Sequence, residues 1–277
     1  MELLWILLAL VVLQPVVAKH LLQASRRRML AKIEKLRGTR VILLMHREET
    51  MSFLGFPVAR YIDINDSEEV LRALDLTEPD TPIDLVLHTP GGLVLAAVQI
   101  ARAIRKRQGK VTAVVPHYAM SGGTLIATAC KEILMSPNAV LGPVDPQVGP
   151  YPASSLLQVL KSKPPDKIDD ETLILADQAG KAVWQVREVV KELLSDKYPP
   201  ERADELARLA SEGHWTHDRP ITFEEIKGLG HPVSDQVPRE FVELMALYPQ
   251  PVRAQPTVEY LPGRRPASPP VPGPRAP

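Results

Sequence analysis

The sequence contains a single cysteine, Cys130, among 277 residues. One cysteine excludes an intramolecular disulfide and any zinc site built from several thiolates. The apolar residues around Cys130 predict a buried side chain that packs as a small hydrophobe. An excess of one charge is also lacking, because 33 Lys and Arg balance 33 Asp and Glu. A folded body without surplus positive charge argues against general nucleic-acid binding.

The positive charge of the chain is concentrated near its N-terminus. Residues 1–40 contain eight Lys and Arg, all of which follow an uncharged apolar run at residues 3–18. A membrane-spanning helix needs about 20 apolar residues, and the flanking Lys19 and His20 can extend the run by snorkelling. Positive charge after the run predicts a single-pass membrane protein with a cytoplasmic soluble domain. A cleaved signal peptide is the alternative, because residues 16–18 resemble a cleavage site.

Changes in composition divide the chain into four predicted parts. Residues 1–22 are expected to form the membrane anchor. Residues 23–40 form a basic juxtamembrane segment that either lies on anionic headgroups or acts as a solvated linker helix. Residues 41–245 have the composition of a folded domain. Residues 246–277 are dominated by proline and are expected to be a disordered tail.

Strand and helix patterns alternate through the folded part. Short aliphatic runs predict strands, and amphipathic segments between them predict helices. The expected strands cover residues 41–46, 83–88, 111–115 and 132–135, and the expected helices cover residues 67–74, 93–107, 122–130, 171–194 and 202–209. Strands with helical crossovers predict an α/β fold with a mainly parallel sheet, whose functional groups gather at the carboxyl ends of the strands.

Two glycine-bearing turns follow predicted strands at that edge. The first contains Gly91 and Gly92, and the second contains Ser121 followed by Gly122. Backbone amides in such turns can bind a developing oxyanion, and a serine at a helix N-terminus can act as a nucleophile. The pair therefore predicts an acyl-transfer site. The alternatives are that Ser121 only caps the following helix and that the glycines only permit tight turns.

Three strings of residues, in this order, resemble a known family. They are Thr89-Pro90-Gly91-Gly92, Met120-Ser121-Gly122-Gly123-Thr124 and Pro137 to Gln147, which reads PNAVLGPVDPQ. The chain resembles the serine dehydrogenase proteinases, a branch of the signal peptide peptidase A-like serine proteases within the Clp protease/crotonase superfamily. The resemblance covers roughly residues 35–245. It implies a ββα spiral, a peptidase acting on peptides or membrane-protein fragments, and a homo-oligomer.

The general base is the open question of this resemblance. Clp-type proteases use a histidine about two dozen positions after the serine, but no histidine lies between Ser121 and His214. The signal peptide peptidase branch uses a lysine some forty to sixty positions beyond the serine. A lysine base must be neutral, which requires burial. Lys181, in an apolar helix pattern, fits best, and Lys163 is the second candidate; Lys161 and Lys167 also fall in the interval. Alternatively, Lys181 is a surface residue paired with Asp177.

The same residues leave two other functions open and bear on whether a cofactor or a metal is bound. A crotonase-like protein would use the glycine amides to bind an acyl thioester without needing Ser121, and an inactive scaffold would need neither. No cofactor is expected, since a dinucleotide-type glycine loop is lacking. No metal site is expected either, because His214 and His217 have too few potential ligands nearby. Asp145 is expected to stabilise its own turn.

Overall fold

The computed structural model describes residues 2–46 and 61–248, so most of the predicted tail lies outside the described residues. Its centre is a five-stranded sheet in the order β1-β2-β3-β5-β9, with every neighbouring pair parallel. The strands are β1 (Arg40–Met45), β2 (Ile83–His88), β3 (Val111–Val115), β5 (Glu132–Met135) and β9 (Val233–Ser234). The prediction of an α/β fold with a parallel sheet is confirmed.

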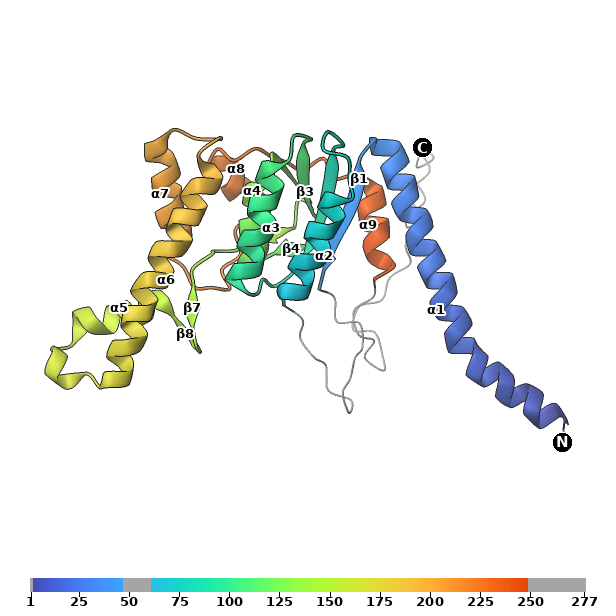
Figure 1. The fold of residues 1–277 in the computed structure, drawn as a ribbon, viewed down its shortest axis with the longest axis horizontal. Helices are drawn as coiled ribbons and strands as arrows, with labels where there is room; N and C mark the ends of the chain where they lie inside the picture. Colours follow the sequence, from blue (N-terminus) through green and yellow to red (C-terminus); the bar gives the residue numbers. More distant parts are fainter. Residues whose placement is uncertain (1, 47–60, 249–277) are drawn as a thin grey trace, which may run out of the picture.

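Helices cover both faces of this sheet (Figure 1). Successive strand residues point to opposite faces, so Leu85 and Ala113 join the larger core while Val86 and Val114 join the smaller one. The larger core is covered by α2 (Ile64–Asp75), α3 (Val94–Lys106), α4 (Gly122–Ala129) and the carboxyl-terminal part of α6 (Asp170–Leu194). The smaller core is covered by α1 (Glu2–Arg37) and α9 (Arg239–Ala246).

The N-terminal segment differs from the sequence expectation. α1 runs continuously from Glu2 to Arg37 and projects from the body in Figure 1. Among the described residues, no helix is both long enough and apolar enough to cross a membrane. The predicted transmembrane helix at residues 1–22, membrane attachment through it and single-pass membrane localisation are therefore wrong. The physical reason is length: the apolar run has about 16 residues, fewer than the roughly 20 required, and the helix continues directly into basic sequence.

The basic half of α1 packs on the folded body. Ile33 is buried in the smaller core with Phe241 of α9. Lys32 pairs with Glu240 at 3.3 Å. Arg37 holds the fully buried carboxylate of Asp84 in β2 through two hydrogen bonds of 2.5 and 2.9 Å. These contacts make α1 part of the core, because a buried carboxylate is tolerated only with such partners.

Short additional strands lie beyond the carboxyl ends of the main strands. β4 (Tyr118–Ala119) pairs in parallel with β6 (Val140–Leu141). Isolated parallel bridges join Thr89 to Ala119 and Ile62 to Gly92. A main strand, a short extended segment and a helix thus follow one another repeatedly, which agrees with the ββα arrangement that the resemblance implies. The bridges also bring the two glycine turns into one layer.

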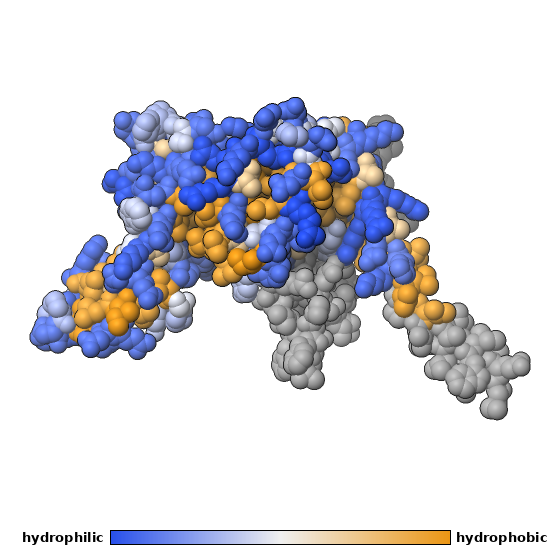
Figure 2. All heavy atoms as spheres, viewed as in Figure 1, coloured by the Kyte–Doolittle hydropathy of each residue, from blue (hydrophilic) through white to orange (hydrophobic). Residues whose placement is uncertain are grey.

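The remaining helices and short strands extend the body on one side. They are β7 (Gln147–Val148), β8 (Tyr151–Pro152), α5 (Ala153–Ser162), a 3-10 turn (Pro165–Lys167), α7 (Pro200–Ser211) and α8 (Phe223–Gly228). α5 and the start of α6 form a hairpin that projects from the body in Figure 1 and has a small core of its own. Apolar residues also gather on the surface of this hairpin (Figure 2). The side chains of Ile174 and Trp184 in α6 are 60% and 62% exposed.

Candidate active site

Ser121 occupies a strained turn between β4 and α4. Its φ and ψ are 48° and −115°, and no other non-glycine residue in the described ranges has a positive φ. Ser121 stands at the N-cap of α4, yet its side chain makes no capping hydrogen bond. A non-glycine residue in such a conformation costs about 1–3 kcal/mol, and such strain clusters at functional sites. The turn therefore presents a hydroxyl that is not used to stabilise the helix.

Gly91 lies directly against Ser121. A Cβ atom added to Gly91 would be 2.7 Å from the Cβ of Ser121 and 3.0 Å from the carbonyl oxygen of Met120. Gly91 also has φ +107°, a conformation that side chains of L-residues rarely adopt. Only glycine allows this approach. The two turns, separated by about thirty positions, thus meet at the carboxyl edge of the sheet, as predicted from the sequence.

The three predicted oxyanion-hole amides differ in their hydrogen bonds. The Gly91 N–H donates to Thr89 Oγ1 at 3.1 Å. Within residues 2–46 and 61–248, the N–H groups of Gly92 and Gly122 donate to no acceptor. A Cβ atom added to Gly122 would lie 3.6 Å from the Gly92 nitrogen, so these two amides are neighbours. Two donors without an acceptor in the described part of the chain therefore lie side by side next to Ser121, and the absence of a side chain at Gly91 allows the two turns to approach.

The predicted lysine bases lie on the projecting hairpin. Lys181 is in α6, its side chain is 68% exposed, and it pairs with Asp177 at 2.5 Å. Lys163 follows the end of α5 and is exposed. Within this single chain, Lys181 lies at the surface in an ion pair with Asp177, the alternative that the sequence left open. The identity of the base remains a prediction.

Sequence reasoning missed an ion pair beyond β6. His217 Nδ1 lies 2.9 Å from Asp145 Oδ1, and Gln147 Nε2 donates to Asp145 Oδ2 at 2.9 Å. The hydrogen bond to Asp145 raises the pKa of His217. Asp145 is buried four residues after Leu141, which pairs with Ala119 just before Ser121. Asp145 therefore orients a histidine as well as its own turn.

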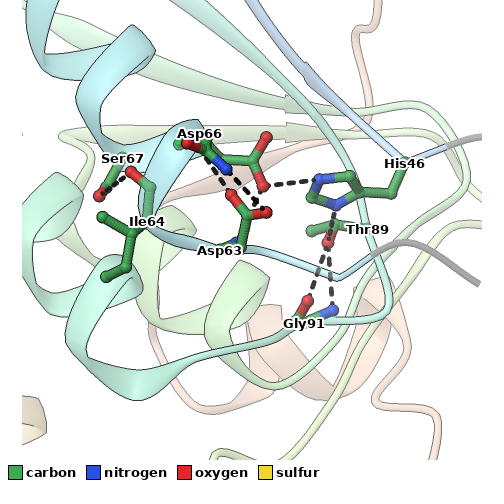
Figure 3. A network of polar contacts seen from close by, with 8 residues as sticks. His46, Asp63, Ile64, Asp66, Ser67, Thr89 and Gly91 are labelled. Atoms are coloured by element: carbon green, nitrogen blue, oxygen red, sulfur yellow. Dashed lines mark hydrogen bonds and ion pairs between the residues drawn. The ribbon is translucent and has the colours of Figure 1, made fainter.

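A second missed network underlies the Gly91 turn. His46, which follows β1, contacts Thr89 with one ring nitrogen and Asp66 of α2 with the other (Figure 3). Thr89 in turn contacts Gly91. The three side chains come from three separate elements, so a single sequence offers no spacing signal for the network. Of the three residues, only Thr89 had a sequence signal, because it belongs to the turn that contains Gly91.

Metal and thiol chemistry have little support in the described part of the chain. No group of three or more His, Cys, Asp or Glu residues in that part is arranged to hold a metal ion. Cys130 is fully buried, and desolvation raises the pKa of its thiol to about 12. A thiol in this state is a poor nucleophile. The prediction that Cys130 packs in the core is confirmed.

The family of the chain follows from comparison with known proteins. The model of the ClpP-like SDH-type serine proteinases matches residues 1–269, so the chain belongs to this family. Two uncharacterized proteins of Methanocaldococcus jannaschii are close relatives. MJ1495 is 53% identical over 238 residues, covering 86% of this chain and 81% of its own length. MJ0137 is 51% identical over 258 residues, covering 93% and 90%.

Solved structures with a similar arrangement are more distant in sequence. ClpP1 from Listeria monocytogenes is 16% identical with a TM-score of 0.45, covering 74% of this chain and 96% of its own. The 1510-N membrane-bound stomatin-specific protease, in a complex with a substrate peptide, is 21% identical with a TM-score of 0.43, covering 66% and 74%.

Proposed function

We propose that this protein is a serine endopeptidase in which Ser121 attacks the scissile peptide carbonyl. The observation that carries the proposal is the strained Ser121 turn, with an uncapped hydroxyl beside the free amides of Gly92 and Gly122. Membership of a serine proteinase family supports the same assignment. Neither helix capping nor turn formation requires this combination.

The geometry fits the steps of acyl transfer. Ser121 Oγ forms a bond to the carbonyl carbon as its proton passes to a base, and the carbonyl oxygen becomes negative. The N–H groups of Gly92 and Gly122 and the N-terminus of α4 stabilise that charge; one such donor is typically worth about 10²–10³ in kcat. The base then protonates the leaving amine as the C–N bond breaks, and water hydrolyses the acyl-enzyme.

An apolar surface borders the proposed oxyanion site. Leu93, Val94 and Leu95 follow Gly92 directly and are 54%, 47% and 61% exposed. Large exposed apolar side chains next to a site favour binding of a partner with apolar groups. A peptide with apolar side chains beside its scissile bond fits this surface, and we expect such peptides to be the substrates.

For the base we propose Lys181, with Lys163 as the alternative. A lysine takes a proton only when it is neutral, and neutrality requires removal from water. Ile174 and Trp184 lie seven positions before and three after Lys181, on the same face of α6, and both are exposed. A second copy of the chain that covered this apolar face would desolvate Lys181. The proposed enzyme is therefore a homo-oligomer whose assembly completes the dyad.

Thioester binding is the competing function. The amides of Gly92 and Gly122 fit a thioester carbonyl as well as a peptide carbonyl, so they do not separate the two functions. Ser121 does separate them, because holding a thioester needs no strained hydroxyl at this position. An inactive scaffold would need neither the free amides nor the strain.

The test is hydrolysis of a fluorescence-quenched peptide library by the purified full chain. We expect turnover that is lost in Ser121→Ala, with an unchanged circular dichroism spectrum. Titration with acetyl-CoA serves as the parallel arm. Hydrolysis that persists in Ser121→Ala would overturn the assigned nucleophile. An absence of hydrolysis together with saturable acetyl-CoA binding would replace the peptidase with the thioester function, and an absence of both would favour the scaffold.

A further inference from the structure

His46 is a buried histidine with two defined partners. Its side chain is 5% exposed, and it stands where the chain leaves β1. Its Nδ1 lies 2.8 Å from Thr89 Oγ1, and its Nε2 lies 3.1 Å from Asp66 Oδ2 (Figure 3). The ring therefore joins the ends of two neighbouring parallel strands to the start of α2.

The donors and acceptors of this network satisfy one another in the Nε2–H tautomer of His46. In this tautomer the Nε2–H group donates to the Asp66 carboxylate. Nδ1 accepts the hydroxyl proton of Thr89, whose oxygen accepts the Gly91 N–H at 3.1 Å. Each group in the chain from Gly91 to Asp66 is thereby satisfied, which matters because Thr89 is fully buried.

Asp66 is itself held in place by α2. Its side chain accepts from the Asp63 N–H at 2.9 Å, and the Asp63 side chain accepts from the Asp66 N–H at 3.0 Å. This capping box places a carboxylate in the first turn, where the helix dipole favours negative charge. The far end of the network is therefore fixed to a helix terminus.

The end of the network at Thr89 fixes the first of two successive amides. The Gly91 N–H donates to Thr89 Oγ1, whereas the Gly92 N–H has no acceptor among the described residues, and the Gly92 nitrogen would lie 3.6 Å from a Cβ atom added to Gly122. Two backbone bonds secure the next part of the turn, from Ile62 N–H to the Gly91 carbonyl at 2.7 Å and from Leu93 N–H to the Ile62 carbonyl at 2.8 Å. Loss of the Thr89 contact would release the Gly91 N–H and so allow the orientation of the Gly92 amide to change.

We propose that His46 and Asp66 are positioning residues that act through Thr89 to hold the Gly91–Gly92 turn so that the Gly92 amide faces the oxyanion formed beside Ser121. This inference rests on the proposed peptidase function, and it adds one residue of α2 and the residue that follows β1 to the site. None of the three side chains touches the reacting atoms.

Isosteric variants test the network. Thr89→Val keeps the shape but lacks the hydroxyl, and Thr89→Ser keeps the hydroxyl. A misplaced catalytic donor typically lowers the rate by about 10²-fold, so we expect Thr89→Val to lower kcat by about 100-fold with KM little changed. Thr89→Ser should retain most of the wild-type kcat. His46→Asn, whose side-chain oxygen can still accept from Thr89, should retain more activity than His46→Leu.

Thr77→Val is the matched control. It makes the same substitution at the carboxyl end of α2, where Thr77 Oγ1 donates to the Ala73 carbonyl at 2.7 Å, and it leaves Asp66 and its capping box in place, so it should lower the melting temperature without changing kcat. Hydrogen exchange provides a readout that does not depend on turnover: the Gly91 amide should be protected in the wild type and exchange faster in Thr89→Val.

Two failures are distinguishable. A wild type without Ser121-dependent hydrolysis would overturn the proposed function and this inference with it. A wild type with such hydrolysis, together with Thr89→Val at full kcat or with an equal fall in kcat for Thr89→Val and Thr89→Ser, would overturn the inference alone.

Discussion

The Ser121 turn and the α5–α6 hairpin present their functional residues in opposite ways. At the turn, strain, a glycine-only contact and two free amides converge from separate elements. On the hairpin, Lys181 is 68% exposed and forms a surface ion pair within its own helix. The proposed nucleophile and oxyanion donors are thus organised by one folded chain, whereas the proposed base is not.

This difference indicates where the proposed assembly would act. The backbone groups of the two turns are fixed within one chain, because β2 and β3, which lead into them, are each paired with a strand on both sides. A projecting helix has only its own small core and must obtain further burial from another surface. We therefore expect the hairpin variants to respond to the state of assembly and the turn variants to be insensitive to it.

Lys181→Ala should have the largest effect that distinguishes the two regions. General base catalysis contributes about 10²–10⁴-fold, so kcat should fall within this range. The free energy of unfolding should change by less than about 1 kcal/mol, because an exposed ion pair contributes little. Activity is measured by peptide hydrolysis and stability by urea unfolding.

Asp177→Asn is the matched control for that variant, because it removes the same ion pair and keeps the lysine. It should retain activity. If Lys163→Ala abolishes hydrolysis while Lys181→Ala is active, the base is Lys163 and the assignment of Lys181 is wrong.

Gly91→Ala tests the turn. The added Cβ would press on Ser121 from 2.7 Å and occupy a disfavoured backbone conformation. Displacing the serine or the adjacent donors should cost about 10²–10³-fold in kcat, similar to the loss of one oxyanion donor. The loss should be the same at all protein concentrations. Full activity in Gly91→Ala would contradict the close contact of the two turns.

Trp184→Glu tests the hairpin surface. The side chain is 62% exposed in the single chain, so protomer stability should change by no more than about 0.5 kcal/mol. Sedimentation velocity should show a smaller species than the wild type, with activity reduced in parallel. A wild type that is active as a monomer would contradict the proposal that a second copy completes the dyad.

The smallest effect is expected from the His217–Asp145 pair. Because the pKa of His217 is raised in the folded state, the pair stabilises the protein below about pH 6.5 and loses this contribution as the pH rises through the raised value. Asp145 is buried but the His217 side chain is 35% exposed, so the pair should contribute about 1 kcal/mol. The melting temperature of His217→Asn should fall furthest below that of the wild type at pH 5.5 and approach it at pH 9. A difference that does not depend on pH would contradict this account.

Sequence patterns predict the parts of this fold that depend on local burial. The runs at residues 83–88, 111–115 and 132–135 coincide with β2, β3 and β5, because strands buried on both faces are continuously apolar. Two-residue strands such as β4 and β6 have no such pattern and exist only through pairing between distant segments. The apolar N-terminal run led to the wrong prediction of a transmembrane helix, because its about 16 residues are fewer than the roughly 20 needed to span a membrane.

The candidate site likewise has parts that the sequence predicts and parts that it does not. Strand-end reasoning predicts that the Ser121 and Gly91 turns lie close together, since parallel strands share a carboxyl edge. It cannot predict that His217 pairs with Asp145, 72 positions away, or that His46 joins Thr89 to Asp66. Such pairs depend on side-chain directions that are set only by the assembled fold.

The central claim is that Ser121 is a preorganised nucleophile. Its most direct test is labelling of the purified chain with a fluorophosphonate probe, followed by peptide mapping of the adduct by mass spectrometry. We expect one adduct, located on Ser121 and absent from Ser121→Ala. No adduct at any pH up to about 10, near the pKa of an unperturbed lysine, or an adduct on a different serine, would contradict it.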